Sequence, residues 1–284
     1  MLSLDPKDLS VQVLQKYLQN AVAPRPICFA STISKDGKPN LAPFSFFNVF
    51  SSNPPILVFS PARSGRTGAT KDTLDNVMEV PEVVINMVNY NMVHQMSLAS
   101  SPFPKGVSEF EKANFTPIPS DVVKPFRVKE SPVQIECKVN EVKSLGTQGG
   151  AGNLVICEVV KIHIQDDVLN AEKHIDTKKI DLVSRMGDNW YCRASGDSLF
   201  EVQKPITTIG IGIDVFPESI KHSKVLSGNN LGLLGSVEAL PSTEEIAEYK
   251  KGMQQFSDEN AKHQYAKTLL EANKVKEAWL VLLS

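Results

Sequence analysis

Positively charged and hydroxyl-bearing side chains gather in the sequence SGRTGATKDT, which contains Arg66 and Lys71. The apolar residues that follow recur at helical spacing and predict a short helix over 73–80. Asp72 or Thr73 has the side chain of an N-cap for that helix. Free backbone amides and the positive end of the helix dipole favour an anion at such a position, and the two cations strengthen this preference.

A phosphate monoester is the anion that would suit this loop. Its serine, threonines and glycines add hydrogen-bond donors and let the backbone approach a ligand closely. The spacing G-x-x-x-x-G-K-[ST] is absent, so the loop is not of the type that binds nucleoside triphosphates. Taken alone, the same residues are also typical of an ordinary basic loop before a capped helix.

Four phenylalanines and several short polar residues share the segment LAPFSFFNVFSSNPP, residues 41–55. Phe46 and Phe47 are adjacent, so they must point to opposite faces of a strand. The prolines interrupt ladder pairing and leave backbone groups free to bind a ligand. Apolar walls with in-plane hydrogen bonds suit a flat heteroaromatic ligand. A core strand with irregular ends would explain the same pattern.

Strand signals dominate the first two-thirds of the chain, after a predicted amphipathic helix at 11–20. We expect strands at 27–34, 41–55, 56–62, 83–89, 132–142 and 153–164. The clearest strand is 132–142, in which apolar and polar residues alternate. We expect one face to be buried, formed by Val133, Ile135, Cys137 and Val139, and the other to be exposed to solvent, formed by Gln134, Glu136, Lys138 and Asn140. Tight turns with few helices between strands indicate a mainly β fold, an antiparallel barrel with short helices.

The C-terminal part of the chain has a different pattern. We expect residues 217–240 to be irregular and residues 241–284 to be helical throughout, starting at a Ser-Thr-Glu-Glu cap. The helical part has an apolar stripe, formed by Ile246, Tyr249, Met253 and Phe256, and ends in the apolar sequence AWLVLL. The predicted domains are therefore 1–200 and 201–284, with the second packed on the barrel or on a second subunit.

Composition excludes several classes of protein. A formal net charge of −2 gives no overall attraction to nucleic acid or to anionic lipid, and no apolar run reaches the length of a membrane span. The N-terminus lacks the pattern of a secretory signal, which predicts a cytoplasmic protein. The four cysteines form no C-x-x-C pair and the five histidines have no ligand spacing, so we expect no metal site.

Several segments, in order along the chain, resemble the flavin reductase-like family. They include PRPICFASTISKDGKPNLAPFSFFNVFSSNPPILVFS, the pattern R-x-x-x-x-KDTLDN that starts at Arg66, NLVICEVV and DLVSRMGDNWY. The resemblance covers residues from about 20 to 195. It implies an FMN-binding split β-barrel of antiparallel, Greek-key-like strands, with the tail as a C-terminal extension outside the common domain.

The resemblance also implies roles for individual residues. The FMN phosphate would be held by Arg66, Lys71, Asp72 and Thr73. The isoalloxazine ring would be lined by Phe44, Ser45, Phe46, Phe47 and Asn48, with Ser45 and Asn48 as side-chain hydrogen-bond partners. The ribityl chain or the ring would contact Thr32 and Ser60, and Arg25 is a further candidate. A nicotinamide contact is expected at His174 and Arg185, for which structural hydrogen bonding is the alternative.

The implied activity is reduction of FMN by NADH or NADPH in a homodimer, with hydride passing to the flavin and electrons going on to oxygen, free flavin or a partner oxygenase. The cofactors carry this chemistry, so no side chain is assigned a catalytic role. One alternative is a flavoredoxin-like FMN-binding electron carrier that makes negligible use of nicotinamide. A second is an enzyme that resembles pyridoxamine-phosphate oxidases, which the phosphate loop alone would also suit.

Overall fold

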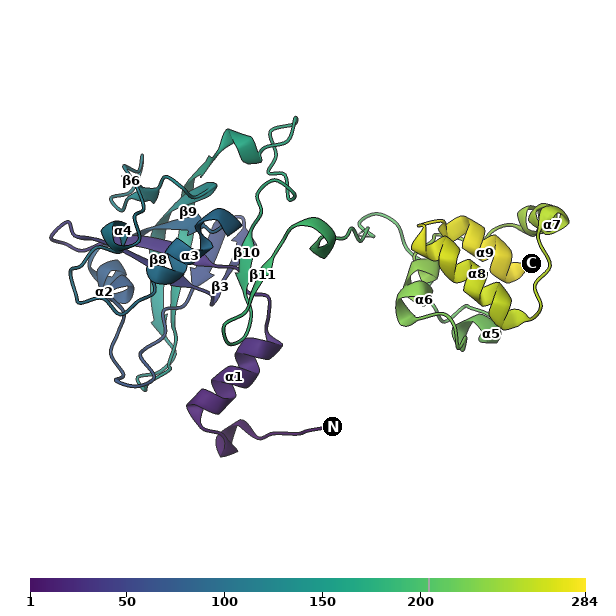
Figure 1. Ribbon diagram of the computed structural model, residues 1–284, viewed down its shortest axis with the longest axis horizontal. Helices are drawn as coiled ribbons and strands as arrows, with labels where there is room; N and C mark the ends of the chain where they lie inside the picture. The colour runs from purple at the N-terminus through teal and green to yellow at the C-terminus, as the bar shows by residue number, and fades with distance from the viewer. Residues whose placement is uncertain (204) are drawn as a thin grey trace. The chain divides into compact units, whose positions relative to one another are not determined.

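A computed structural model describes residues 1–203 and 205–284 and divides them into two units, Met1–Phe200 and Glu201–Ser284 (Figure 1). No helix in these two described ranges is long and apolar enough to cross a bilayer. The division falls at the boundary that the change of sequence pattern predicted.

The first unit is built on antiparallel strands. Its strands are β1 Cys28–Ile33, β2 Pro39–Phe44, β3 Phe47–Ser52, β4 Pro55–Phe59, β5 Glu82–Met87, β6 Pro117–Ile118, β7 Arg127–Val128, β8 Val133–Ser144, β9 Asn153–Ile164, β10 Val183–Arg185 and β11 Tyr191–Arg193. Its α-helices are α1 Val11–Ala21, α2 Asp72–Glu79, α3 Val93–Leu98 and α4 Glu109–Lys112. The expected strands and the first helix are therefore confirmed, except that 41–55 contains β2, β3 and the start of β4.

Seven strands form one sheet in the order β2-β1-β5-β8-β9-β4-β3, and all the neighbours pair antiparallel. The sheet curves back on itself, because side chains from β1 and β4, near its two ends, share one buried cluster. Phe44 at the end of β2 lies against Phe59 of β4, with ring centroids 5.6 Å apart. The fold is the split β-barrel that the sequence indicated.

Two cores lie on opposite faces of this sheet. The barrel interior contains Cys28 and Ala30 of β1 together with Phe59 of β4, and α2 covers it with Leu74 and Val77. The outer core lies between the sheet and the short helices α3 and α4, which are drawn beside the strands in Figure 1. Its central side chains are Phe29, Leu41, Met92, Met96 and Phe110. The strict alternation of β1 sends consecutive residues to different cores.

The face of β8 that was expected to be solvent-exposed is only partly exposed. Lys138 and Asn140 are exposed, but Gln134 and Glu136 are buried. Glu136 accepts hydrogen bonds from the amides of Asp121, Val122 and Val123 at 2.7–3.0 Å, and His163 Nε2 lies 2.6 Å from its Oε1. The expectation was wrong here because the segment before β7 covers the strand, which the alternation within β8 does not reveal.

Asp121, Glu136 and His163 bring three potential metal ligands within 4.8 Å of one another, although the sequence spacing suggested no such group. Protein donors already use these atoms. Lys161 lies 2.5 Å and Arg127 3.8 Å from the Asp121 carboxylate. With its four donors, Glu136 is likewise satisfied, so this network is best explained as a link between β8, β9 and the covering segment.

The second unit is a small helical bundle. Its helices are α5 Glu218–Lys221, α6 Gly228–Gly235, α7 Thr243–Gly252, α8 Glu259–Glu271 and α9 Val275–Leu283. Residues 217–240 are thus not simply irregular, since they contain α5 and α6, and residues 241–284 form three helices rather than one. The predicted cap is confirmed, because Ser242 and Glu245 form a capping box.

The helical unit has a hydrophobic core of its own. Trp279 is fully buried, packs edge-on against Phe216 with ring centroids 4.9 Å apart, and donates a hydrogen bond to the carbonyl of Leu234. The apolar sequence at 278–283 is therefore buried within the unit itself, and Tyr249 and Phe256 pack against the same core. Docking of this unit on the barrel or on a second subunit stays a proposal.

Candidate functional site

The loop between β4 and α2 folds back on itself. The amide of Ser64 donates to the carbonyl of Ala69 at 2.9 Å, and the amide of Gly68 donates to the carbonyl of Ser64 at 2.8 Å. Arg63 at its base pairs through its backbone with Gly150 and Ala151 of the glycine turn. The loop is therefore anchored to the barrel on one side and runs into a helix on the other.

Arg66 and Lys71 are both exposed, and neither forms an ion pair within the described part of the chain. Lys71 is the N-cap of α2, with extended backbone and no side-chain hydrogen bond to the helix. The N-cap was predicted at Asp72 or Thr73, which are instead the first two residues of the helix. No side chain competes for the first amides of α2, so they remain free to bind an anion.

A buried polar network lies beneath the start of α2. Asn40 Nδ2 donates to Thr73 Oγ1 at 2.9 Å and to Thr32 Oγ1 at 3.2 Å, and Asn76 Nδ2 donates to Thr32 Oγ1 at 3.1 Å. Thr32 is fully buried, so its hydroxyl fixes the helix to the sheet in this structure. The sequence analysis did not single out Asn40 or Asn76. The one weak signal was Asn40 itself, a polar residue directly before the predicted strand 41–55.

Arg63 is a third cationic residue that the sequence analysis did not single out. Its Nη1 donates to the carbonyl of Gly68 at 3.3 Å, inside the loop. Its Nε is buried and has no hydrogen-bond partner among the described residues. A buried unpaired donor is costly, and an anion bound in the loop would supply the missing acceptor.

Ser60 and the aromatic segment lie at the entrance to this loop. The Ser60 amide donates to the carbonyl of Phe46 at 2.8 Å, and the Ser60 hydroxyl accepts from the amide of Asn153 at 3.1 Å. A Cβ at Gly152 would lie only 2.7 Å from Ser60 Oγ, so this approach requires glycine. The Ser60 side chain is mostly buried against the glycine turn.

The phenylalanines divide between the two faces of the segment, as their adjacency requires. Phe44 and Phe47 pack against the barrel core, whereas Phe46 is 41% exposed. Asn48 is exposed and its Oδ1 accepts a hydrogen bond from the amide of Val49. Ser45 accepts a 3.4 Å bond from Arg25 Nε. Phe46 and Asn48 thus present side chains at the surface, and Phe44 and Phe47 support them from within.

Arg25 is buried and heavily bonded. Its guanidinium donates to the carbonyls of Gln19, Val22 and Met186, and its backbone bridges to Arg185. Burial, and then the nearby charge of Arg185, lower the pKa of Arg25. Most of its donors tie the end of α1 to the segment after β10. Its link to the aromatic segment is the Ser45 hydroxyl.

The two candidate nicotinamide residues lie in different surroundings. Arg185 stacks on Tyr191, 4.7 Å from the ring centroid, and lines a cleft of about 440 Å³ together with Tyr90 and His94. His174 lies in an exposed turn closed by hydrogen bonds with Asn170, and it does not line that cleft. The structure therefore places Arg185, but not His174, at a cavity.

Among the described residues, three observations fit the loop to a phosphorylated ligand: two exposed cations without ion-pair partners, uncapped amides at the start of α2, and the unpaired buried Nε of Arg63. The carbonyl of the exposed Phe46 accepts a hydrogen bond from the amide of Ser60, the residue that leads into the loop. A split barrel with such a loop fits the class of flavin-binding barrel proteins. The chain belongs to the flavin reductase-like family, since the family's Flavin reductase like domain matches residues 21–179.

Known proteins agree with this assignment. The chain is 37% identical over 197 residues to an uncharacterized protein of Aquifex aeolicus, a match that covers 69% of this chain and 97% of that protein. Among solved structures it is similar to nitrilotriacetate monooxygenase component B from Bacillus cereus, with 30% identity, a TM-score of 0.66, and coverage of 71% and 98%. It is also similar to 2-nitrobenzoate 2-nitroreductase of Pseudomonas fluorescens, with 25% identity, a TM-score of 0.64, and coverage of 74% and 100%.

Proposed function

We propose that the protein is an FMN-dependent reductase that takes hydride from NADH or NADPH and passes electrons on. The observation that carries the proposal is the pair of exposed cations, Arg66 and Lys71, at the uncapped start of α2 in a flavin reductase-like barrel; neither forms an ion pair within residues 1–203 and 205–284. FMN carries a phosphate monoester there, whereas riboflavin does not. Bound flavin would supply the hydride acceptor, so the protein need provide no acid or nucleophile.

The side chains then have binding roles. Arg66, Lys71 and the amides of Asp72 and Thr73 hold the phosphate, and the Asp72 carboxylate takes no part because it would repel the ligand. Phe46 provides an apolar wall for the ring, and Ser45 and Asn48 offer hydrogen bonds at its polar edge. Thr32 and Ser60, whose hydroxyls already accept protein donors, shape the path between phosphate and ring. Arg185 lines the cleft proposed for the reductant, and His174 is proposed as a second nicotinamide contact from outside that cleft.

A homodimer is part of this proposal. No residue of α1 is buried, and Val11, Tyr17 and Leu18 on this helix are each about half exposed. An amphipathic helix whose apolar side chains are largely exposed is stabilised when a second surface covers it. Sedimentation of the purified protein tests the dimer, and a monomer at micromolar concentration contradicts it.

The electron acceptor is proposed from the relatives. One similar structure is a component of a monooxygenase, which favours a partner oxygenase that receives reduced flavin. Free flavin or oxygen would serve as acceptor in the absence of such a partner. The flavoredoxin-like carrier remains the alternative outcome of the experiment below.

Two measurements test the function. Binding of FMN and riboflavin is compared by fluorescence quenching, and FMN should bind at least about tenfold more tightly because charge-assisted bonds to its phosphate are lost in riboflavin. Equal affinities would overturn the assignment of the loop. The FMN complex is then titrated anaerobically with NADH and with NADPH, and bleaching of the flavin absorbance identifies a reductase. Binding of FMN without bleaching by either nucleotide would identify the carrier.

A further inference from the structure

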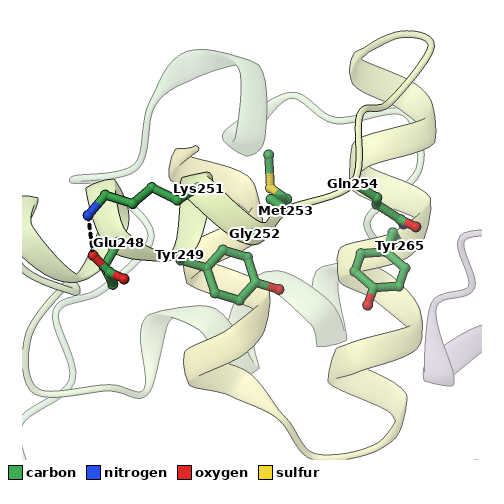
Figure 2. A pocket seen from close by; sticks show the side chains of 7 residues that line it. All are labelled: Glu248, Tyr249, Lys251, Gly252, Met253, Gln254 and Tyr265. Carbon is green, nitrogen blue, oxygen red and sulfur yellow. Dashed lines mark hydrogen bonds and ion pairs between the residues drawn. The ribbon is translucent and has the colours of Figure 1, made fainter.

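His263 is buried in the helical unit and has no part in the proposed function. It lies on α8, the helix from which Tyr265 faces an open cleft whose charged lining residues, Glu248 and Lys251, pair with each other at 2.5 Å (Figure 2). His263 comes two residues before Tyr265, a rotation of about 200° around a helix, so it faces away from that cleft. Only 2% of the residue is exposed. The match to the flavin reductase-like family ends at residue 179, so this histidine lies outside the family domain.

The hydroxyl of Ser223 fixes the protonation state of this ring. Ser223 lies between α5 and α6, and its Oγ accepts hydrogen bonds from the amides of Val225 and Leu226, both at 3.1 Å. A serine oxygen has two lone pairs, so these two amides occupy both of them. In the remaining contact, 2.8 Å from Oγ to His263 Nδ1, the hydroxyl must therefore donate its proton. Nδ1 is then an acceptor, and the neutral ring carries its proton on Nε2.

The other side of the ring offers little compensation for a positive charge. Nε2 is buried and has no hydrogen-bond partner among the described residues. Glu259 Oε1, one turn earlier on α8, lies 3.7 Å from Nε2, which is beyond a hydrogen bond, and its side chain is 58% exposed. Burial lowers the pKa of His263, Glu259 raises it by less, and Lys262 lowers it further, so the pKa lies below its ordinary value.

The neighbouring elements bring no second carboxylate to the imidazole within the described part of the unit. α8 packs against α6, whose sequence GNNLGLLG has no titratable residue, and against α9. The titratable side chains of α9 and of the segment around Ser223 are exposed or already paired: Lys276 and Glu277 on α9, and Glu218, Lys221, His222 and Lys224 around Ser223. The charge state of His263 is therefore decided by burial, Ser223 and the two α8 side chains.

We propose that Ser223 and His263 form a pH-sensitive latch, which holds the segment 222–227 on α8 while the imidazole is neutral and releases it when the imidazole is protonated. The added proton binds Nδ1, because Nε2 already carries one. Nδ1 then directs a proton at a hydroxyl oxygen whose two lone pairs are occupied, so the bond between the two side chains is lost. Ile220 and Leu226, on either side of Ser223, are buried in the core of the unit, so release exposes apolar surface.

The pH range of the latch follows from the two states of the ring. In the released segment the imidazole has its ordinary pKa of about 6.5, and in the latched segment the pKa of His263 is lower. The latched state is therefore fully favoured above about pH 6.5. It is lost progressively as the pH falls from there toward the pKa of the latched ring, by at most about tenfold per pH unit for one proton.

Amide hydrogen exchange of the full-length protein tests the latch. The amides of Val225 and Leu226 bond to Ser223 Oγ, so their protection, corrected for the intrinsic exchange rate at each pH, reports how much of the segment is latched. Protection should fall about threefold to tenfold between pH 7.5 and pH 5.5. The amides of the barrel strand β1 should keep their protection over the same range. Equal protection of Val225 and Leu226 at the two pH values would overturn the proposal.

A variant and a matched control assign the effect to His263. His263→Gln keeps an acceptor for the Ser223 hydroxyl but cannot titrate, so the fall in protection should disappear. His222→Gln, at an exposed histidine one residue before Ser223, should keep it. A fall that persists in His263→Gln would overturn the proposal. If His263→Gln does not fold, an NMR titration of the imidazole in the unsubstituted protein decides: a pKa below about 6.5 with Nδ1 unprotonated supports the latch, and a pKa at or above that value overturns it.

Discussion

The side-chain amide of Asn40 donates a 2.9 Å hydrogen bond to the hydroxyl of Thr73, joining the start of β2 to the first turn of α2. Both residues are more than nine-tenths buried. The same asparagine reaches Thr32 on β1 at 3.2 Å, so the helix start is fixed to two strands. The position of the proposed phosphate site therefore depends on a polar network that the ligand itself need not contact.

Asn40→Ala should lower both stability and FMN affinity. Loss of the amide leaves the buried hydroxyl of Thr73 without this donor and leaves Thr32 with Asn76 as its remaining donor, which costs about 1–3 kcal/mol in the free energy of unfolding. Riboflavin binding should change less than FMN binding, because only the phosphate end is displaced. Urea unfolding and flavin titration measure these effects. Asn140→Ala, at an exposed position on β8, is the control and should change neither; an FMN affinity untouched in Asn40→Ala would contradict the positioning role.

Arg66→Ala and Lys71→Ala should weaken FMN binding while the flavin-free protein stays as stable as before. Each removes a charge-assisted contact to the phosphate, a loss of about tenfold in affinity. Both side chains are exposed, and surface substitutions usually change stability by only about ±0.5 kcal/mol. Thermal unfolding is compared without flavin, since bound ligand adds stability of its own. Lys138→Ala is the exposed control, and a large drop in melting temperature for Arg66→Ala or Lys71→Ala would favour a structural role instead.

Glu136 should make stability depend on acid pH. Burial raises its pKa, but the bonds from the amide of Asp121, His163 and the amides of Val122 and Val123 outweigh burial, so the pKa is lowered overall. A carboxyl whose pKa is lowered in the folded protein contributes its full stabilisation at pH values above its pKa in the unfolded chain, about 4.3. This contribution is lost as the pH falls through the folded-state pKa.

Glu136→Gln should therefore cost about 1–3 kcal/mol at pH 7, and the difference from the unsubstituted protein should shrink as the pH falls below about 4. Urea unfolding at a series of pH values measures this. Glu141→Gln, at an exposed position on the same strand, should behave like the unsubstituted protein throughout. A constant difference between pH 7 and pH 3 would show that Glu136 acts through packing rather than through its charge.

Two truncations distinguish the effect of losing the helical unit's own core from the effect of losing its proposed docking on the barrel. Ending the chain at residue 240 removes α7, α8 and α9 and leaves Phe216, Ile220 and Leu234 without their packing partners, so this protein should aggregate. Ending it at residue 200 removes the whole unit. The proposed docking then predicts a lower melting temperature for the barrel, and the almost fully exposed Phe200, Ile206 and Ile209 favour a covering surface. A barrel of unchanged stability would contradict docking.

Local pattern was sufficient for much of the fold. Runs of strand-forming residues between turns predicted β1, β5 and β9, alternation predicted β8, helical spacing predicted α1 and α2, and a Ser-Thr-Glu-Glu sequence predicted the start of α7. These features depend on residues a few positions apart, so the sequence predicts them directly. The exposed cations of the loop before α2 were likewise predicted, while their contact with a phosphate stays a prediction.

Burial across the chain was decided only by the tertiary structure. Glu136 is in a strand that alternates as expected, yet a segment from before β7 covers it and supplies three amide donors. Asn40 and Asn76 meet at Thr32 only because α2 lies on β1 and β2. The apolar helices of the tail suggested a surface that needs the barrel, yet they bury much of that surface among themselves. Which distant segment covers a residue is a property of the folded chain, since periodicity fixes the face of an element but not what packs against it.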